Sequence, residues 1–381
     1  VHALLGSDHV FLAGALGAVI VTWFTFLFSF IFILTGAPII ESTHNELKFT
    51  KNRNIQIYNT KKLLSKDFIA SLASYSAVVF HSLSSIPLKR LVMKVSLDVK
   101  FVWLGWGGDY YETIPQLKRT LYEQQTLKLM SSLTSLKEKV KKAIKALIPN
   151  YDIEVEEIYK RVNYFGPVLY DEYKLLEEIF APVHTKYIPF SYGQLENDLT
   201  QGIEYLEING ENILLGNSAT FSNNHLEIIE LLKNLDLGDR KVIVPLNYGN
   251  KEYAREIISF GNNKIKNNFY PLSEFMDKEK YHKLLSGCSI CIMNHKRQQS
   301  LGNIVSVLYL GSKLFLNKEN IVYRFLKREG AVIFSIEDLN TKSISVKLTK
   351  NEIELNRSIL MKHWSEEVVN EKYRSFVNLL K

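Results

Sequence analysis

Short apolar runs alternate with amphipathic segments along most of this chain, and the alternation predicts its fold. The strand-like runs lie at residues 55–58, 76–80, 100–104, 212–215, 241–244, 289–293 and 313–316. Segments with helical spacing stand between them, including 62–72, 86–93 and 304–310. Strands that alternate with helices in this way form parallel sheets, with the loops that follow the strands gathered at one edge. The pattern predicts an α/β fold of doubly wound, Rossmann-like domains.

The length and one interruption of the pattern predict two domains. A chain of 381 residues exceeds what one hydrophobic core usually serves. Pro189 and Gly193 interrupt the alternation, so we expect a first domain at residues 1–190 and a second at 191–350. A last helix is expected within residues 351–381 and is predicted to return to the first domain.

Residues 10–40 carry no charged side chain and admit two interpretations. One is a transmembrane helix, which the basic residues after it would orient with the rest of the chain in the cytoplasm. The other is an opening βαβ unit, with strands at 1–6 and 28–34 around an apolar helix at 10–24 that would dip into lipid. Both interpretations place the chain at a membrane surface.

Charge and cysteine content narrow the classes of partner. A net charge of +7 requires an anionic partner, and the lysine-rich helix expected at 135–148 fits either an anionic membrane or a solvated surface. The sequence contains no zinc-finger spacing, no RNA-binding aromatic motif and no arginine run, which argues against nucleic acid. Cys288 and Cys291 lie inside an apolar strand without a second Cys or His pair, so we interpret them as buried thiols.

Two polar loops follow predicted strands of the second half. The first contains Gly216, Asn217 and Ser218 and leads into Ser222, Asn223, Asn224 and His225, which open a helix. The second contains Arg297, Gln298, Gln299, Ser300, Gly302 and Asn303. A turn followed by a helix N-terminus offers N–H groups to a phosphate, and an arginine can hold the diphosphate that accumulates charge as it leaves. The same residues also fit an ordinary turn with Ser222 or Asn223 as helix cap.

Acidic and basic groups at other strand ends complete the candidate site. Glu274 is a candidate for binding the nucleoside ribose, and Glu319 is a candidate for binding hydroxyl groups of the donor sugar or the ribose. The competing interpretation is that both are solvated surface acids. In the first half, the glycine-rich segment 105–112 contains aromatic rings that can stack on sugars, and Asp109, a candidate base for an acceptor hydroxyl. His81, at the end of the run 76–80, is the alternative base. Asp109 as a loop former and His81 as a structural residue are the competing interpretations.

Taken together, these segments resemble one enzyme family. The resemblance rests on Gly6-Ser7-Asp8, VVFHSL at 78–83, WGGDY at 106–110, GNSATFSNNH at 216–225, KVIVPLNYGN at 241–250, CSICIMNHKRQQSLGN at 288–303 and LFLNKEN at 314–320. They are similar to the bacterial TDP-N-acetylfucosamine:lipid II N-acetylfucosaminyltransferases, the 4-alpha-L-fucosyltransferase family of enterobacterial common antigen synthesis. The resemblance implies a GT-B fold, with a nucleotide-activated deoxyamino sugar on the second domain and a polyprenyl-diphosphate-linked acceptor on the first.

The expected function is transfer of a deoxyamino sugar from a dTDP-sugar to that lipid-linked acceptor, at the cytoplasmic face of the bacterial inner membrane. We expect no cofactor and no essential metal, because the sequence has no DxD motif of the metal-dependent nucleotide-sugar enzymes. Two alternatives stay open. One is a nucleotide-sugar epimerase or hydrolase that needs no lipid, and the other is a noncatalytic membrane-attached protein that retains the fold.

Overall fold

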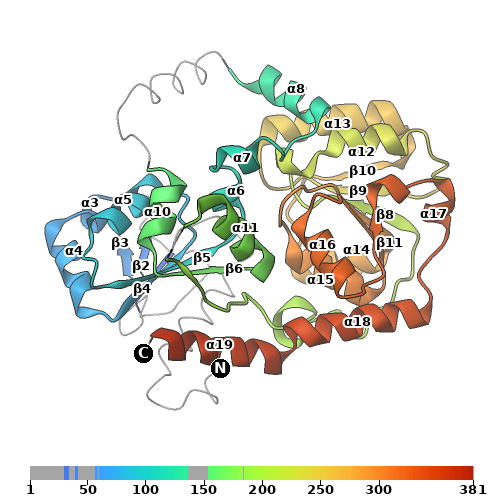
Figure 1. The fold of residues 1–381 in the computed structure, drawn as a ribbon. Coiled ribbons are helices and arrows are strands. Elements are labelled where there is room, and N and C mark those ends of the chain that lie inside the picture. Colours follow the sequence, from blue (N-terminus) through green and yellow to red (C-terminus); the bar gives the residue numbers. More distant parts are fainter. Residues whose placement is uncertain are drawn as a thin grey trace. The chain divides into compact units, whose positions relative to one another are not determined.

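The computed structural model describes residues 60–135, 153–182 and 184–380, together with three short strands nearer the start of the chain (Figure 1). The chain forms two compact units, neither of which is one continuous segment. Unit 1 takes its described residues from Val1–Ile114, Asn150–Gln194 and Glu366–Lys381, and unit 2 from Pro115–Pro149 and Leu195–Ser365. The domain boundaries expected from the sequence therefore differ from these units in three places. Residues 115–135 and 351–365 belong to unit 2 and not to the first domain, and residues 191–194 belong to unit 1 and not to the second.

The described strands of unit 1 form one sheet with the order β3-β2-β1-β4-β5-β6-β7. Their bounds are Phe30–Ile33 (β1), Ile39–Glu41 (β2), Gln56–Tyr58 (β3), Ala77–His81 (β4), Lys100–Gly105 (β5), Tyr164–Pro167 (β6) and Lys186–Tyr187 (β7). From β4 to β7 the neighbours are parallel, as predicted. The expectation of a parallel sheet is wrong for β1, which runs antiparallel to both β2 and β4. The gap between β1 and β2 is too short for the crossover of about a dozen residues that a parallel pair needs.

The strand expected at 28–34 is therefore present as β1, but it does not have the parallel neighbours of a βαβ unit. The other parts of that unit, and the choice between it and a membrane span at 10–40, lie outside the described residues. The basic helix expected at 135–148 lies outside them as well. Among the helices that the structure does describe, none is long and apolar enough to cross a membrane.

Helices cover the sheet of unit 1. They are α3 (Thr60–Leu63), α4 (Lys66–Ser71), the 3-10 helix η3 (Leu72–Ser74), α5 (Ile86–Lys94), α6 (Gly108–Tyr111), α10 (Val155–Arg161), α11 (Tyr170–Phe180) and α19 (Glu366–Leu380). The predicted helix at 86–93 is confirmed as α5, which begins where the Ser85 hydroxyl accepts a hydrogen bond from Leu88 N. Its buried apolar side chains, Leu88, Leu91 and Val92, recur at the helical spacing that the sequence displays.

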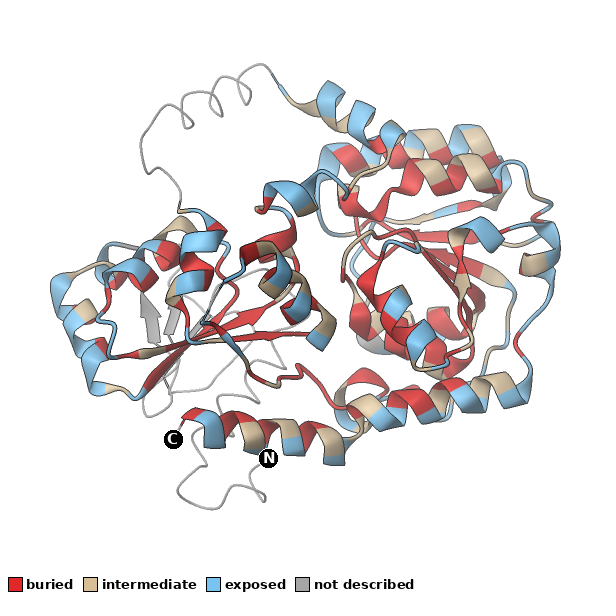
Figure 2. Cartoon of the chain, viewed as in Figure 1, coloured by how far each residue is buried: buried red, intermediate tan, exposed pale blue. Residues whose placement is uncertain are grey.

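Unit 2 contains a parallel sheet with the order β10-β9-β8-β11-β12-β13 among its described strands. The bounds are Asn212–Leu215 (β8), Val242–Pro245 (β9), Phe269–Leu272 (β10), Cys288–Met293 (β11), Lys313–Leu316 (β12) and Phe334–Ser335 (β13). This is a doubly wound sheet, and its strand order reverses between β8 and β11. Ligands of such sheets bind outside the carboxyl ends of the strands at that reversal. The four strands predicted in this half are all confirmed, and Figure 2 shows how fully the central strands are buried.

The helical segments of unit 2 are α7 (Pro115–Lys118), α8 (Gln124–Leu133), η4 (Leu195–Leu199), η5 (Phe221–Asn223), α12 (His225–Leu232), α13 (Lys251–Ile265), η6 (Lys266–Asn268), α14 (Lys278–Ser286), α15 (Leu301–Leu310), α16 (Ile321–Arg328), η7 (Ile336–Asp338), α17 (Thr341–Ser345) and α18 (Lys350–Trp364). Helix α8 joins this unit because the Glu227 carboxylate accepts hydrogen bonds from the backbone N and hydroxyl of Thr126, and because Leu129 and Leu133 pack on the core.

The last helical stretch is two helices and not one. Helix α18 ends at Ser365, whose extended backbone (φ −56°, ψ 155°) breaks the helix before α19 starts. In unit 2 the Asn356 amide of α18 hydrogen-bonds with both backbone groups of Val332. In unit 1 Tyr373 Oη of α19 donates to Ser191 O at 2.8 Å, and Gln194 Nε2 donates to Asn370 Oδ1 at 3.0 Å. The break lets consecutive helices belong to different units.

Candidate functional site

The two polar loops predicted from the sequence meet at the strand-order reversal of unit 2. Strands β8 and β11 are hydrogen-bonded neighbours, so the loop at 216–224 and the loop at 294–300 leave the same edge of the sheet. At their base, Gly216 N donates to Ile292 O at 2.9 Å. We call these two loops the donor-loop pair.

Buried amide side chains bind the donor-loop pair together. Gln299 Nε2 donates to Asn217 Oδ1 at 3.0 Å, and Gln299 Oε1 accepts from Ser222 Oγ at 2.6 Å. On the other side, Asn217 Nδ2 donates to Tyr248 Oη at 2.8 Å. Each amide uses both its donor and its acceptor end, so the loop backbones are held in one arrangement before any ligand arrives.

A second set of contacts centres on Asn223. Its Oδ1 accepts from Asn217 N at 3.0 Å and lies 2.7 Å from His295 Nε2, while its Nδ2 donates to Ser218 O at 2.9 Å. Since Asn223 Oδ1 accepts, His295 Nε2 carries the proton of this contact, which leaves Nδ1 as an acceptor. His295 was not predicted as a site residue, although its position two residues after the buried strand β11 was a usable signal.

Three buried polar atoms in and next to the donor-loop pair have no hydrogen-bond partner among the residues that the structure describes. They are His225 Nε2, His295 Nδ1 and Gln298 Oε1. Burial lowers the pKa of His225 to about 3, and burial, helped by Arg297 and His225, lowers the pKa of His295 well below its ordinary value. Both imidazoles are therefore neutral. Unsatisfied buried groups of this kind are costly unless a ligand or water completes them.

Gly216 is required by this packing. Its φ of +68° lies in the left-handed region, and an added Cβ would stand 2.4 Å from His225 Nε2 and 2.7 Å from Asn223 Oδ1. Backbone and imidazole are thus in direct contact, and only a residue without a side chain fits between them.

Both helices that follow the donor-loop pair begin at a left-handed residue. The N-cap of α12 is Asn224 (φ +48°) and not the predicted Ser222 or Asn223. Its amide is used elsewhere, because Nδ2 donates to Asn294 O at 3.0 Å and Oδ1 accepts from Glu123 N at 2.9 Å. The N-cap of α15 is Ser300 (φ +57°), and it makes no capping hydrogen bond with its side chain. Gly302 and Asn303 lie in the first turn of α15, an end that attracts anions.

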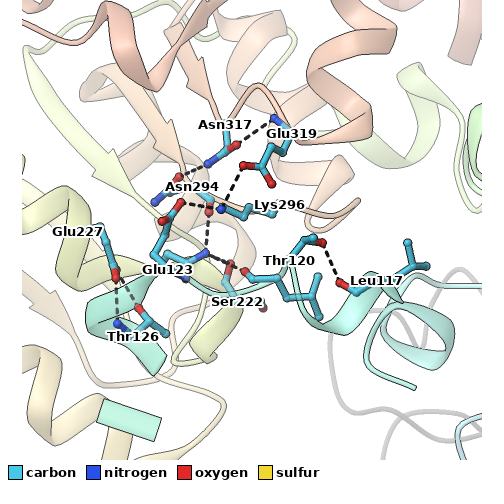
Figure 3. Close-up of polar contacts among 12 residues, drawn as sticks. Leu117, Thr120, Glu123, Thr126, Ser222, Glu227, Asn294, Lys296, Asn317 and Glu319 are labelled. Atoms are coloured by element: carbon cyan, nitrogen blue, oxygen red, sulfur yellow. Dashed lines mark hydrogen bonds and ion pairs between the residues drawn. The ribbon is translucent and has the colours of Figure 1, made fainter. Parts of the chain in front are cut away.

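Lys296 lies between two carboxylates at this edge (Figure 3). Its Nζ is 2.9 Å from Glu123 Oε1 and 3.2 Å from Glu319 Oε1, and only 11% of its side chain is exposed. Burial alone would lower the pKa of Lys296, but the two glutamates raise it above its ordinary value. Neither Lys296 nor Glu123 was selected from the sequence, whereas Glu319 was.

The remaining predicted donor residues differ in their positions. Arg297 is a half-buried residue of the donor-loop pair, and its Nη1 donates to Gln298 O at 2.9 Å. Glu274 is exposed in the loop after the edge strand β10, and β9 stands between that strand and β8. The structure thus places Arg297 with the other residues of the donor-loop pair, whereas Glu274 lies at the outer edge of the sheet.

In unit 1, Asp109 is a buried carboxylate inside the glycine-rich turn after β5. Its Oδ2 accepts from Trp103 Nε1 at 2.7 Å and from Leu83 N at 3.3 Å, and its Oδ1 accepts from Trp106 N at 2.9 Å. Burial raises the pKa of Asp109, against the opposing effect of these hydrogen bonds. The carboxylate ties the turn after β5 to the turn after β4.

His81 ends β4 at the same edge of the sheet, within a cluster of aromatic rings. Its ring centroid lies 6.0 Å from Trp106 and 5.9 Å from Phe190, and Tyr192 stands 5.6 Å from Trp106. Burial lowers the pKa of His81 to about 3, so its imidazole is neutral. Trp106 alone among these rings is only half-buried, which leaves part of an aromatic surface for a sugar.

Comparisons with known proteins agree with this arrangement. Residues 184–367 match the family model described as 4-alpha-L-fucosyltransferase, glycosyl transferase group 56. Solved structures with a similar fold include sucrose-phosphate synthase from Thermosynechococcus elongatus, with a TM-score of 0.59 and 9% identity over 89% of this chain and 87% of that one. A glycosyltransferase from Rickettsia africae has a TM-score of 0.54 and 13% identity over 86% and 84%.

The N-terminal domain of Candida albicans trehalose-6-phosphate phosphatase matches with a TM-score of 0.54 and 11% identity over 86% of this chain and 83% of that one. At such identities the structural likeness establishes the fold, and the family match establishes the kind of enzyme. The chain is a glycosyltransferase of the GT-B fold, and its residues 184–367 match the 4-alpha-L-fucosyltransferase family model, glycosyl transferase group 56.

Proposed function

We propose that this enzyme transfers a deoxyamino sugar resembling N-acetylfucosamine from a dTDP-sugar to a polyprenyl-diphosphate-linked oligosaccharide, in cell-surface polysaccharide synthesis. The observation that carries the proposal is the donor-loop pair, where Gln299 joins the loops after β8 and β11 at the reversal of strand order. In doubly wound sheets this is the position at which a nucleotide's phosphates are bound.

In this proposal the donor's diphosphate is held by backbone N–H groups of the donor-loop pair, by the N-terminus of α15 and by Arg297. These groups stabilise the negative charge that develops on the diphosphate as the glycosidic bond breaks. The orphaned acceptors His295 Nδ1 and Gln298 Oε1 would accept hydrogen bonds from hydroxyl or N–H groups of the donor. The reaction needs no cofactor in this scheme, and the absence of an essential metal stays a prediction.

We assign the acceptor to unit 1, where the half-buried ring of Trp106 would stack on a sugar. His81 would take the proton from the attacking hydroxyl, a role that requires the bound acceptor to raise the pKa of its imidazole from about 3. Three N–H groups already occupy Asp109, which favours a positioning role that holds Trp106 next to His81. The net charge of +7 supports work at the anionic cytoplasmic face of the bacterial inner membrane, where such lipid-linked acceptors are found.

The decisive experiment combines binding and transfer. Calorimetry with dTDP and other nucleoside diphosphates tests the donor class, and transfer from a dTDP-sugar to a polyprenyl-diphosphate disaccharide tests the acceptor. Arg297→Ala is expected to weaken dTDP binding, because it removes a cation next to the diphosphate. A wild-type protein that binds none of the nucleotides would refute the proposal, and donor hydrolysis without transfer would replace it with a hydrolase.

Two variants separate the roles of His81 and Asp109. His81→Gln is expected to abolish transfer while leaving dTDP affinity and thermal stability unchanged. Asp109→Asn should lower the stability of unit 1 and the affinity for the acceptor, yet its residual transfer should keep the wild-type pH profile. An Asp109→Asn enzyme with native stability, no transfer at any pH and an active His81→Gln counterpart would reverse the assignment.

A further inference from the structure

Lys296 is a largely buried cation that is paired with two carboxylates. Two carboxylates contact its Nζ, at 2.9 Å from Glu123 and 3.2 Å from Glu319, so the three side chains together carry a net negative charge. Lys296 stands in the same loop as Gln299, which holds Asn217 and Ser222. A diphosphate approaching the donor-loop pair would therefore meet an excess carboxylate close to the cation that it needs.

The two carboxylates differ in their freedom to move. Glu123 has 31% of its side chain exposed, and its backbone N donates to Asn224 Oδ1 inside unit 2. Glu319 has 57% of its side chain exposed, in the loop after β12 (Figure 3). Turning an exposed side chain into water requires no repacking, so Glu319 is the partner that can leave Lys296 at little cost.

We propose that Lys296 changes partners when the donor binds. Its ammonium leaves Glu319 and contacts the diphosphate, while Glu123 keeps it in place. The released Glu319 carboxylate then accepts hydrogen bonds from hydroxyl groups of the donor's deoxyribose or of its transferred sugar. No covalent bond changes in this step. The inference rests on the proposed function, because it concerns the same donor site.

The exchange predicts that the variants respond differently to inorganic pyrophosphate, which has no sugar hydroxyl group, and to dTDP, which has one. For Lys296→Gln, we expect the affinity for inorganic pyrophosphate and for dTDP to fall about tenfold to a hundredfold, the usual effect of losing a hydrogen bond to a charged group. For Glu319→Gln, pyrophosphate affinity should rise about twofold to fivefold, because its competitor for Lys296 has lost its charge. The affinity for dTDP should gain less, since the hydroxyl contact is weakened.

The measurement is isothermal titration of the full-length protein with both ligands, with thermal unfolding as the check on folding. Lys264→Gln is the matched control. Lys264 also forms an ion pair in unit 2, at 2.7 Å from Glu230, but it stands at the end of α13, away from the donor-loop pair. This control is expected to leave both affinities unchanged. Should Lys296→Gln fail to fold, the exposed Glu319→Gln substitution still provides the test.

The outcomes distinguish a failure of the proposed function from a failure of the partner exchange. If the wild-type protein binds neither ligand, the proposed function fails, and the partner exchange fails with it. If the wild-type protein binds dTDP but Lys296→Gln binds it equally well, only the exchange is refuted. The exchange is also refuted if Glu319→Gln gains no affinity for pyrophosphate, or gains as much for dTDP as for pyrophosphate.

Discussion

Replacing Gly216 by alanine should destabilise unit 2 through two separable effects. The first is conformational, because φ at this position is +68° and a left-handed backbone costs about 1–2 kcal/mol for a residue with a Cβ. The second is steric, because the new Cβ would lie 2.4 Å from His225 Nε2 and 2.7 Å from Asn223 Oδ1. Forcing an extra carbon into a packed site costs about 1–3 kcal/mol more. We expect a total loss of about 2–5 kcal/mol.

Gly330 supplies the control that isolates the steric effect. Its φ is +88°, but a Cβ added there would meet nothing within 4 Å. Gly330→Ala should therefore cost only about 1–2 kcal/mol. Both residues lie in unit 2, so both substitutions act on the same unfolding transition, and calorimetry should show a lower transition temperature for Gly216→Ala by about 2–4 °C per kcal/mol of the difference. Equal shifts for the two variants would show that His225 does not lie against Gly216.

Three further predictions concern the buried histidines, the half-buried Trp106 and the buried thiols. In the folded protein, His225 and His295 have pKa values below the unfolded value of 6.5. The unfolded state therefore binds protons at a higher pH than the folded state does, and the free energy of unfolding falls as the pH drops below about 6.5. Denaturant titrations should show the slope approaching about 1.4 kcal/mol per pH unit for each histidine, and a flat profile between pH 6.5 and 5 would contradict their neutral burial. Trp106→Ala should raise the acceptor KM at least several-fold in the transfer assay while dTDP affinity stays constant, and an unchanged KM would remove Trp106 from the acceptor site. Burial raises the pKa of Cys288 to about 12 and that of Cys291 well above its usual value. Both thiols should therefore react with a thiol reagent only after denaturant is added. Rapid labelling of the native enzyme would contradict this prediction.

The part of the fold that could be predicted from the sequence is the part with strong local patterns. The central strands β8, β9, β11 and β12 are continuous apolar runs, and the common edge of parallel strands brings the loop at Gly216 toward the loop at Gln299. The edge strand β10 was missed because its Pro271 argues against a strand, and β13 was missed because it has only two residues. The direction of β1 depends on its pairing with β4, which no local pattern encodes.

The candidate site was predictable to a similar extent. Residues that follow strands, such as Asn217 and Gln299, could be selected because topology places them at the ligand edge. His295 was missed because it stands outside the two polar segments that the sequence displays, although only one residue separates it from the strand β11. Glu123 was missed for a different reason, since its ion pair with Lys296 joins segments far apart in the sequence and requires α8 to cross into unit 2.

The placement of α19 has a consequence for biosynthesis. All strands of unit 2 leave the ribosome before α19 does, so that unit can complete its core while unit 1 still lacks a helix. Until α19 docks, the surface that receives Val369, Tyr373 and Phe376 stays open to water and to other nascent chains. Removing α19 should therefore damage the half of the enzyme that is synthesised first, and a truncated chain should require chaperones for unit 1 even when unit 2 has folded.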